Sequence, residues 1–275
     1  EDALGAHAAA TRAESGAPEA LAALAFIRLE QAKASQDEGD YRAAAELHRE
    51  VVTLQPDGAE GWLRLGQIAR RLGDLTEARA ALDAWLALPH ADETTLVQVH
   101  MALGDICLRQ NDMAAAERHY REVLRRDSRV AEAYFNMGYV ATALGRVAQA
   151  AWFYEAALEI DPSLTESHHL VGALYVRLER HDDAKAAYLR AIESDATAGG
   201  PHERLAHLLA TLGEDLEGAR RHAEAAVALD PGSAEYLNTL SWVHYLSENH
   251  VEAETTLLRA LEGDPDNAAY RDGLD

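Results

Sequence analysis

The sequence predicts an all-α solenoid built from about seven antiparallel helix pairs. Two series of small residues carry this prediction, because each recurs every 34 residues. The first series is Gly104, Gly138 and Gly172, and the second is Ala116, Ala150 and Ala184. A fixed period of this length is typical of stacked helical repeats, whose units bury their apolar faces only against their neighbours. We therefore expect one elongated array without a closed globular core.

The helix pairs are expected to begin at equivalent points of successive periods. The predicted starts lie near Ala25, Ala59, Val97, Ala131, Thr165, Gly199 and Ala234, which gives an array over residues 25–267. Residues 1–24 are rich in Ala, Gly and Glu, and we expect a lead-in, a linker or an N-terminal helix there. Residues 268–275 begin another helix and stop, so we expect a short cap or a truncated continuation. The first residue, Glu1, is not methionine, which indicates processing or truncation.

Residues 131–162 show the physical role of each position most clearly. The first helix has a stripe that faces the stack, formed by Tyr134, Met137, Gly138 and Ala141. The second helix has a matching stripe, formed by Ala150, Tyr154 and Ala157. Gly138 allows a neighbouring helix to approach closely, and Gly145 stands where a left-handed residue is favoured after a helix. The second helix ends at Asp161, because a residue before proline is driven out of the helical conformation.

These landmarks resemble the tetratricopeptide repeat family, and the resemblance covers roughly residues 25–267. In the second unit the matching residues are Trp62, Leu65, Gly66, Gly73 and Ala78. In the last unit they are Leu240, Ala253, Leu257, Ala260 and Pro265. The resemblance implies a right-handed superhelix with a concave groove, built mainly by the first helix of every unit. It also implies that the groove binds a peptide or a helix of a partner protein.

The period slips by four residues between the second and third units. Ala78 and Ala116 are 38 residues apart, and the surplus lies in residues 88–93. Trp85 also occupies a position where the pattern favours alanine. We expect a locally splayed helix pair at this point.

A smaller slip and two unusual turn residues occur elsewhere. Ala184 and Ala219 are 35 residues apart, and we expect the extra residue to lengthen the turn at residues 214–215. Glu179 stands where the turn glycine belongs, and Asn111 takes the same place in the third unit. Asparagine tolerates the left-handed conformation better than most residues do. Both turns are therefore expected to be slightly strained.

Composition excludes several classes of function. The formal charge is −22 and the isoelectric point is near 4.9, whereas phosphate binding needs clustered Lys and Arg. We therefore expect no nucleic-acid partner. No apolar run approaches the roughly 20 residues of a membrane helix, so direct membrane insertion is not expected. Both the cytoplasm and the periplasm remain open, and the alanine-rich, highly charged composition is typical of a bacterial protein.

The sequence contains no signature of catalysis. It has no phosphate-binding glycine loop, no dinucleotide fingerprint and no nucleophile elbow, so we expect neither an enzyme nor a cofactor. His202 and His207 lie five residues apart, whereas a helical zinc pair needs a spacing of four, so no metal site is expected. Cys107 lies on the core stripe of the third unit and is expected to be a buried structural residue.

The residues beside the core stripe of each first helix are the candidates for partner binding. They are Arg71, Met101, Arg109, Phe135, Tyr139, His169, Arg177, His207, Trp242 and Tyr245. Arg71, Arg109 and Arg177 occupy equivalent places and are expected to form a ladder that binds carboxylates of a peptide. The aromatic members would supply apolar contact area, which is typical of interface anchors.

The function that these observations favour is a non-catalytic scaffold for protein–protein interaction. We expect it to hold a peptide or helix of a partner protein in the groove during assembly of a complex. Two alternatives stay open at this point. One is a substrate-recruiting arm of a larger enzyme, such as a glycosyl- or sulfotransferase, and the other is a scaffold that self-associates as a homo-oligomer.

Overall fold

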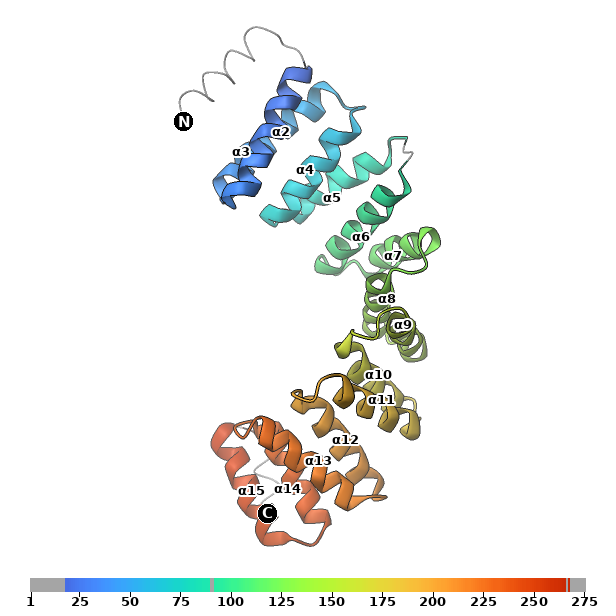
Figure 1. The fold of residues 1–275 in the computed structure, drawn as a ribbon, viewed down its shortest axis with the longest axis vertical. Helices are drawn as coiled ribbons and strands as arrows, with labels where there is room; N and C mark the ends of the chain where they lie inside the picture. The colour runs from blue at the N-terminus through green and yellow to red at the C-terminus, as the bar shows by residue number, and fades with distance from the viewer. Residues whose placement is uncertain (1–17, 90–91, 266, 268–275) are drawn as a thin grey trace. The chain divides into compact units, whose positions relative to one another are not determined.

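The computed structural model describes residues 18–89, 92–265 and 267, and in these residues all regular secondary structure is helical. The predicted all-α fold of antiparallel helix pairs is confirmed. The chain divides into two compact units, unit 1 from Glu1 to Ser128 and unit 2 from Arg129 to Asp275. Figure 1 shows the helices of each unit arranged as consecutive pairs.

Unit 1 contributes three helix pairs from its described residues. They are α2 (Pro18–Ser35) with α3 (Glu38–Leu54), α4 (Ala59–Leu72) with α5 (Leu75–Leu86), and α6 (Glu93–Arg109) with α7 (Met113–Arg126). Apolar residues on facing stripes join each pair to the next. One such cluster links α3 to α4 through Val52, Leu65 and Ile68. Each pair therefore completes its core with residues of the neighbouring pair.

Unit 2 contributes four helix pairs from its described residues. They are α8 (Ala131–Ala143) with α9 (Val147–Ile160), α10 (Thr165–Arg177) with α11 (His181–Ser194), α12 (Gly199–Leu212) with α13 (Leu216–Leu229), and α14 (Ala234–Leu246) with α15 (His250–Gly263). A single cluster of buried residues runs from Ala141 of α8 to Val243 of α14. The inner surfaces of the four pairs thus share one apolar core.

Five first helices begin at the residues where the sequence places a repeat start, whereas α2 and α6 begin earlier. Helix α2 starts at Pro18, seven residues before the expected Ala25. Proline suits the first turn of a helix, and Leu21 and Leu24 bury their side chains beside Val51 of α3. Residues 18–24 are therefore part of the first helix pair. The rest of the expected lead-in, residues 1–17, and the expected cap at 268–275 lie outside the described residues.

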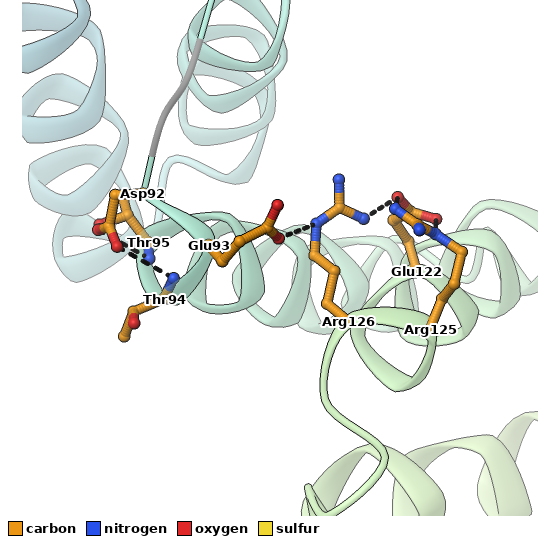
Figure 2. Close-up of polar contacts among 7 residues, drawn as sticks. All are labelled: Asp92, Glu93, Thr94, Thr95, Glu122, Arg125 and Arg126. Carbon is orange, nitrogen blue, oxygen red and sulfur yellow. Dashed lines mark hydrogen bonds and ion pairs between the residues drawn. The ribbon is translucent and has the colours of Figure 1, made fainter.

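The four surplus residues of the third unit form one extra turn at the start of α6. This helix begins at Glu93 and not at Val97, and Asp92 caps it by accepting hydrogen bonds from the backbone N–H groups of Thr94 and Thr95, both at 3.1 Å. Figure 2 shows this cap. Helices α5 and α6, which belong to successive pairs, are packed less extensively against each other than α3 and α4 are. Trp85 is nevertheless buried there.

The extra turn of α6 also makes polar contacts with the end of α7. A carboxylate oxygen of Glu93 lies 3.2 Å from Nε of Arg126, whose guanidinium group also pairs with Glu122. Arg125 lies 2.8 Å from the same carboxylate of Glu122. Figure 2 shows these contacts. The side chain of Arg126 is only 15% exposed, whereas those of Glu93 and Arg125 are 74% and 64% exposed, so only the arginine at the centre of the network is shielded from water.

A glycine of the first helix faces a tyrosine ring of the second helix in three consecutive pairs. The contacts are Gly104 with Tyr120, Gly138 with Tyr154, and Gly172 with Tyr188, each 16 residues apart. A Cβ atom placed on any of these glycines would lie 2.5–2.9 Å from the ring, which is far inside van der Waals contact. The close approach expected at Gly138 is therefore confirmed, and the neighbour is the second helix of the same pair.

Every helix pair turns through one residue with positive φ. These residues are Gln36, Gly73, Asn111, Gly145, Glu179, Gly213 and Glu248. The left-handed conformation expected at Asn111 and Glu179 is confirmed by φ values of 60° and 58°. After Gly213 two residues, in place of one, precede the next helix, so the turn at 214–215 is longer as predicted.

Replacing Glu179 by glycine is expected to raise the free energy of unfolding by about 0.5–1 kcal/mol, because the left-handed conformation strains a residue with a Cβ atom more than it strains glycine. Urea unfolding followed by circular dichroism measures the change. The reverse substitution in the neighbouring pair, Gly145→Glu, is the matched control and should lower stability by a similar amount, since only its φ of 71° disfavours a side chain there. Equal midpoints for all three proteins would contradict the strain.

Candidate functional site

None of the ten candidate residues is buried, so all of them reach the surface of their unit. Six are exposed, namely Arg71, Arg109, Tyr139, Arg177, His207 and Tyr245, and four are half-buried, namely Met101, Phe135, His169 and Trp242. Arg71, Met101 and Arg109 belong to unit 1, and the other seven belong to unit 2. The Phe, Tyr and Trp candidates are thus all in unit 2, on the first helices α8 and α14, and the two histidines lie on α10 and α12. We call these seven residues of unit 2 the inner stripe.

The structure brings two members of the inner stripe into direct contact. The rings of His207 in α12 and Trp242 in α14 have centroids 5.0 Å apart and are tilted by 42°. Tyr245, one turn further along α14, is 61% exposed. Tyr139 of α8 is 51% exposed. An exposed apolar ring is costly to leave in water, so these rings are suited to contact with another molecule.

Two candidates have roles within the fold itself. Phe135 packs its ring edge-on against Tyr154, with centroids 5.3 Å apart, so it extends the core beneath the inner stripe. Arg71 of unit 1 donates a hydrogen bond to Oε1 of Gln36 at 2.8 Å and lies over the ring of Tyr41 at 5.7 Å. Its guanidinium group is already engaged by the preceding helix pair. This weakens the expected arginine ladder at its first rung.

His169 lines a pocket of about 440 Å³ at the start of α12. The other polar lining groups are Asp195, Arg204 and Tyr236, and Gly199 and Gly200 leave room for the tyrosine ring. Hydrogen bonds from Thr197 lower the pKa of Asp195, so its carboxylate belongs to the turn before α12. Sequence reasoning missed Arg204 and Tyr236. The signal for this pocket was the Gly199-Gly200-Pro201 run, which starts a helix almost without side chains.

A buried polar contact joins α12 to α14 below the inner stripe. The carboxylate of Glu203 is 3% exposed and accepts a hydrogen bond from the hydroxyl of Thr239 at 2.8 Å. Burial raises the pKa of Glu203, and the neighbouring Arg204 and the Thr239 bond oppose that rise. Arg204 also lies 3.0 Å from Glu235 of α14. These contacts fix α12 against α14 and so help to hold His207 against Trp242.

Family comparison agrees with the repeated helix pairs. The tetratricopeptide repeat models match residues 29–92, 98–164, 165–197 and 210–274. The chain belongs to the tetratricopeptide repeat family. The matches cover all seven helix pairs in part, with residues 198–209 between two of them. This is a family of interaction scaffolds, and its repeats account for the glycine and tyrosine positions described above.

Solved structures similar to the chain are also repeat proteins. The C-terminal part of a TPR repeat-containing protein from Cytophaga hutchinsonii has a TM-score of 0.69 at 16% identity, covering 86% of this chain and 95% of its own. PilF of Pseudomonas aeruginosa gives 0.60 at 18%, covering 78% and 95%. MamA of Desulfovibrio magneticus gives 0.58 at 19%, covering 66% and 99%. At these identities the likeness shows the fold alone. No curated protein matches the chain significantly.

Three further observations concern chemistry and membranes. Across the described ranges, no helix has both the length and the apolar character to cross a bilayer. The same residues contain no group of three or more His, Cys, Asp and Glu side chains placed to hold a metal ion. Cys107 is fully buried, as expected, and burial raises the pKa of its thiol. Its thiol is therefore suited to packing and not to nucleophilic chemistry.

Proposed function

We propose that the tetratricopeptide repeats of unit 2 hold a peptide or a helix of a partner protein along the inner stripe, in a non-catalytic scaffold for assembly of a complex. The observation that carries this proposal is the exposure of aromatic rings on the first helices α8 and α14. Tyr139 and Tyr245 are more than half exposed, and the rings of His207 and Trp242, which lie between them in sequence, are in tilted contact. Such rings are the usual anchors of an interface.

The charge distribution of unit 2 supports binding on the first helices. Helices α8 and α14 each contain one charged residue among their 13, Glu132 and Glu235 respectively. The aromatic rings therefore lie on helices that carry almost no charge. Arg177 at the end of α10 is exposed and can pair with a carboxylate of the partner. The inner stripe therefore combines apolar anchors with one cation.

The double variant Tyr139→Ala/Arg177→Ala is expected to lose a partner that the parent chain retains from lysate of the source organism, while circular dichroism shows unchanged helicity. Both side chains are exposed, so their truncation removes surface contacts without opening the core. Affinity capture followed by mass spectrometry identifies the partner, and titration of the purified partner measures the loss. A loss of one to two orders of magnitude in affinity corresponds to removal of an anchor residue.

The matched control is Trp152→Ala/Arg190→Ala, which also removes one exposed aromatic ring and one exposed arginine, but from the second helices α9 and α11. This variant should bind the partner like the parent. If it loses the partner while the Tyr139/Arg177 variant keeps it, binding uses the second helices and the proposal is wrong. If the parent binds no protein at all, the alternative of a recruiting arm for an enzyme is favoured.

A further inference from the structure

In one helix pair of each unit, a histidine of the first helix contacts a histidine of the second helix at the same position of the repeat. In unit 1, Nδ1 of His100 in α6 lies 3.1 Å from Nδ1 of His119 in α7. In unit 2, Nδ1 of His202 in α12 lies 3.0 Å from Nδ1 of His222 in α13. The ring planes are tilted by 38° and 39°, with centroids 5.4 Å and 5.2 Å apart. The two units therefore contain the same arrangement.

A pair of aromatic rings occupies this position in the α8–α9 pair. Tyr134 and Phe153 have centroids 6.5 Å apart and a tilt of 43°, close to the geometry of the histidine pairs. The histidine pairs and the Tyr134–Phe153 pair both pack the first helix against the second. In each helix pair they lie just N-terminal to the glycine–tyrosine contact, or to the residues equivalent to that contact. The histidine pairs thus fill an aromatic packing position with rings that can take up protons.

The hydrogen bond between the two Nδ1 atoms requires that at least one of the two rings be neutral, because one Nδ1 must stay bare to accept. A hydrogen bond between them needs one N–H donor and one bare nitrogen acceptor, which two neutral imidazoles in opposite tautomers provide. When both rings are protonated, both Nδ1 atoms carry hydrogens and both rings carry charge. The hydrogen bond is then lost, and two positive charges lie about 3 Å apart in a site shielded from water.

The surroundings of both pairs disfavour the protonated form. Burial lowers the pKa of His100 to about 4, with further lowering by His119, and burial also lowers the pKa of His119, His202 and His222. The charged groups near the first pair are Arg79 and Asp83 of α5, and Asp112, Arg118, Arg125 and Arg126 around α7. Those near the second pair are Asp215, which caps the start of α13, and Arg221 within that helix. The carboxylates oppose the lowering without cancelling it.

We propose that the two histidine pairs are acid-sensitive contacts, which hold α6 to α7 and α12 to α13 at neutral pH and release them in mild acid. Because the pKa values are lower in the folded chain than the usual 6.5, the stabilising contribution is complete above pH 6.5 and is lost as pH falls below it, down to about pH 4 for His100. Both units have a histidine pair at the same position of the repeat. A single drop in pH would therefore loosen one helix pair in each unit.

The test replaces each pair by the rings found in α8–α9. The variants are His100→Tyr/His119→Phe and His202→Tyr/His222→Phe. In the parent chain, the unfolding equilibrium constant should rise about 30-fold between pH 8 and pH 5 from His100 alone, as a shift of pKa from 6.5 to about 4 requires. Each variant should show a correspondingly smaller rise in urea titrations. His250→Gln, at an exposed histidine, is the control and should leave the rise unchanged.

Direct titration by NMR keeps the proposal testable if a variant fails to fold. The ring Cε1–H resonances of His100, His119, His202 and His222 should move to those of imidazolium only below the ordinary pKa of 6.5. Amide exchange of α6, α7, α12 and α13 should accelerate at pH 5 beyond that of α8 and α9, after correction for intrinsic rates. Ordinary titration of all four rings near pH 6.5, or an unchanged pH dependence in both variants, would overturn the proposal.

Discussion

Replacing Gly138 by leucine is expected to lower the free energy of unfolding of unit 2 by about 3 kcal/mol, at the upper end of what overpacking a close contact costs. Even a single Cβ atom at this position would lie 2.8 Å from two ring carbons of Tyr154. The ring is only 2% exposed and is flanked by Phe135, so it cannot swing into solvent without opening the core. The midpoint of urea unfolding measures the loss.

The control for this experiment is Ala143→Leu, which places the same side chain on an exposed position of the same helix. It should change stability by less than about 0.5 kcal/mol, as most surface substitutions do. A Gly138→Leu protein with the same midpoint as Ala143→Leu would show that the ring does not lie over the glycine. Leucine has a higher helix propensity than glycine by roughly 0.8 kcal/mol, so the observed loss is a lower limit for the steric cost.

The Gly138–Tyr154 contact illustrates how far the sequence predicts this fold. The 34-residue spacing of the glycines is visible in the sequence alone, and it was sufficient to place the helix pairs and the turn at Gly145. The starts of α2 and α6 were predicted too late, because the 34-residue period was extended into two units whose first helix begins earlier than that period places it. At α6 the correct signal was Asp92 followed by Thr94 and Thr95, a local capping pattern that the period concealed.

The inner stripe was predictable in part, for a related reason. Helical spacing identifies which residues lie beside the core stripe, and all ten candidates do reach the surface. Spacing does not identify what a side chain meets on the next helix pair. Glu203 lies at the position of Phe135 and His169 in its own repeat, yet it is buried because Thr239 of α14 offers it a hydrogen bond. Such a contact depends on the packing of two repeats together.

His48 is expected to make unit 1 sensitive to acid independently of the histidine pairs. The four second helices of unit 2 have an alanine at the position that His48 takes in α3, namely Ala157, Ala191, Ala226 and Ala260, whereas α5 and α7 have Trp85 and Val123 there. The ring of His48 is 4% exposed, and neither nitrogen has a hydrogen-bond partner among the described residues. Burial, helped by Arg64 and opposed by Glu60, lowers the pKa of His48 to about 4. The ring is therefore held neutral at physiological pH.

The stability that depends on neutral His48 is present above pH 6.5 and is lost as pH falls toward 4, because the unfolded chain binds a proton that the folded chain does not. Between pH 7 and pH 4.5 this amounts to about 2 kcal/mol. His48→Leu should remove that part of the pH dependence and leave stability at pH 7 equal or higher, since leucine has no polar atoms to leave unpaired. The His100→Tyr/His119→Phe protein should keep this part, and the triple variant should lose both. A His48→Leu protein with the parent's pH dependence would mean that the ring is hydrated and titrates normally.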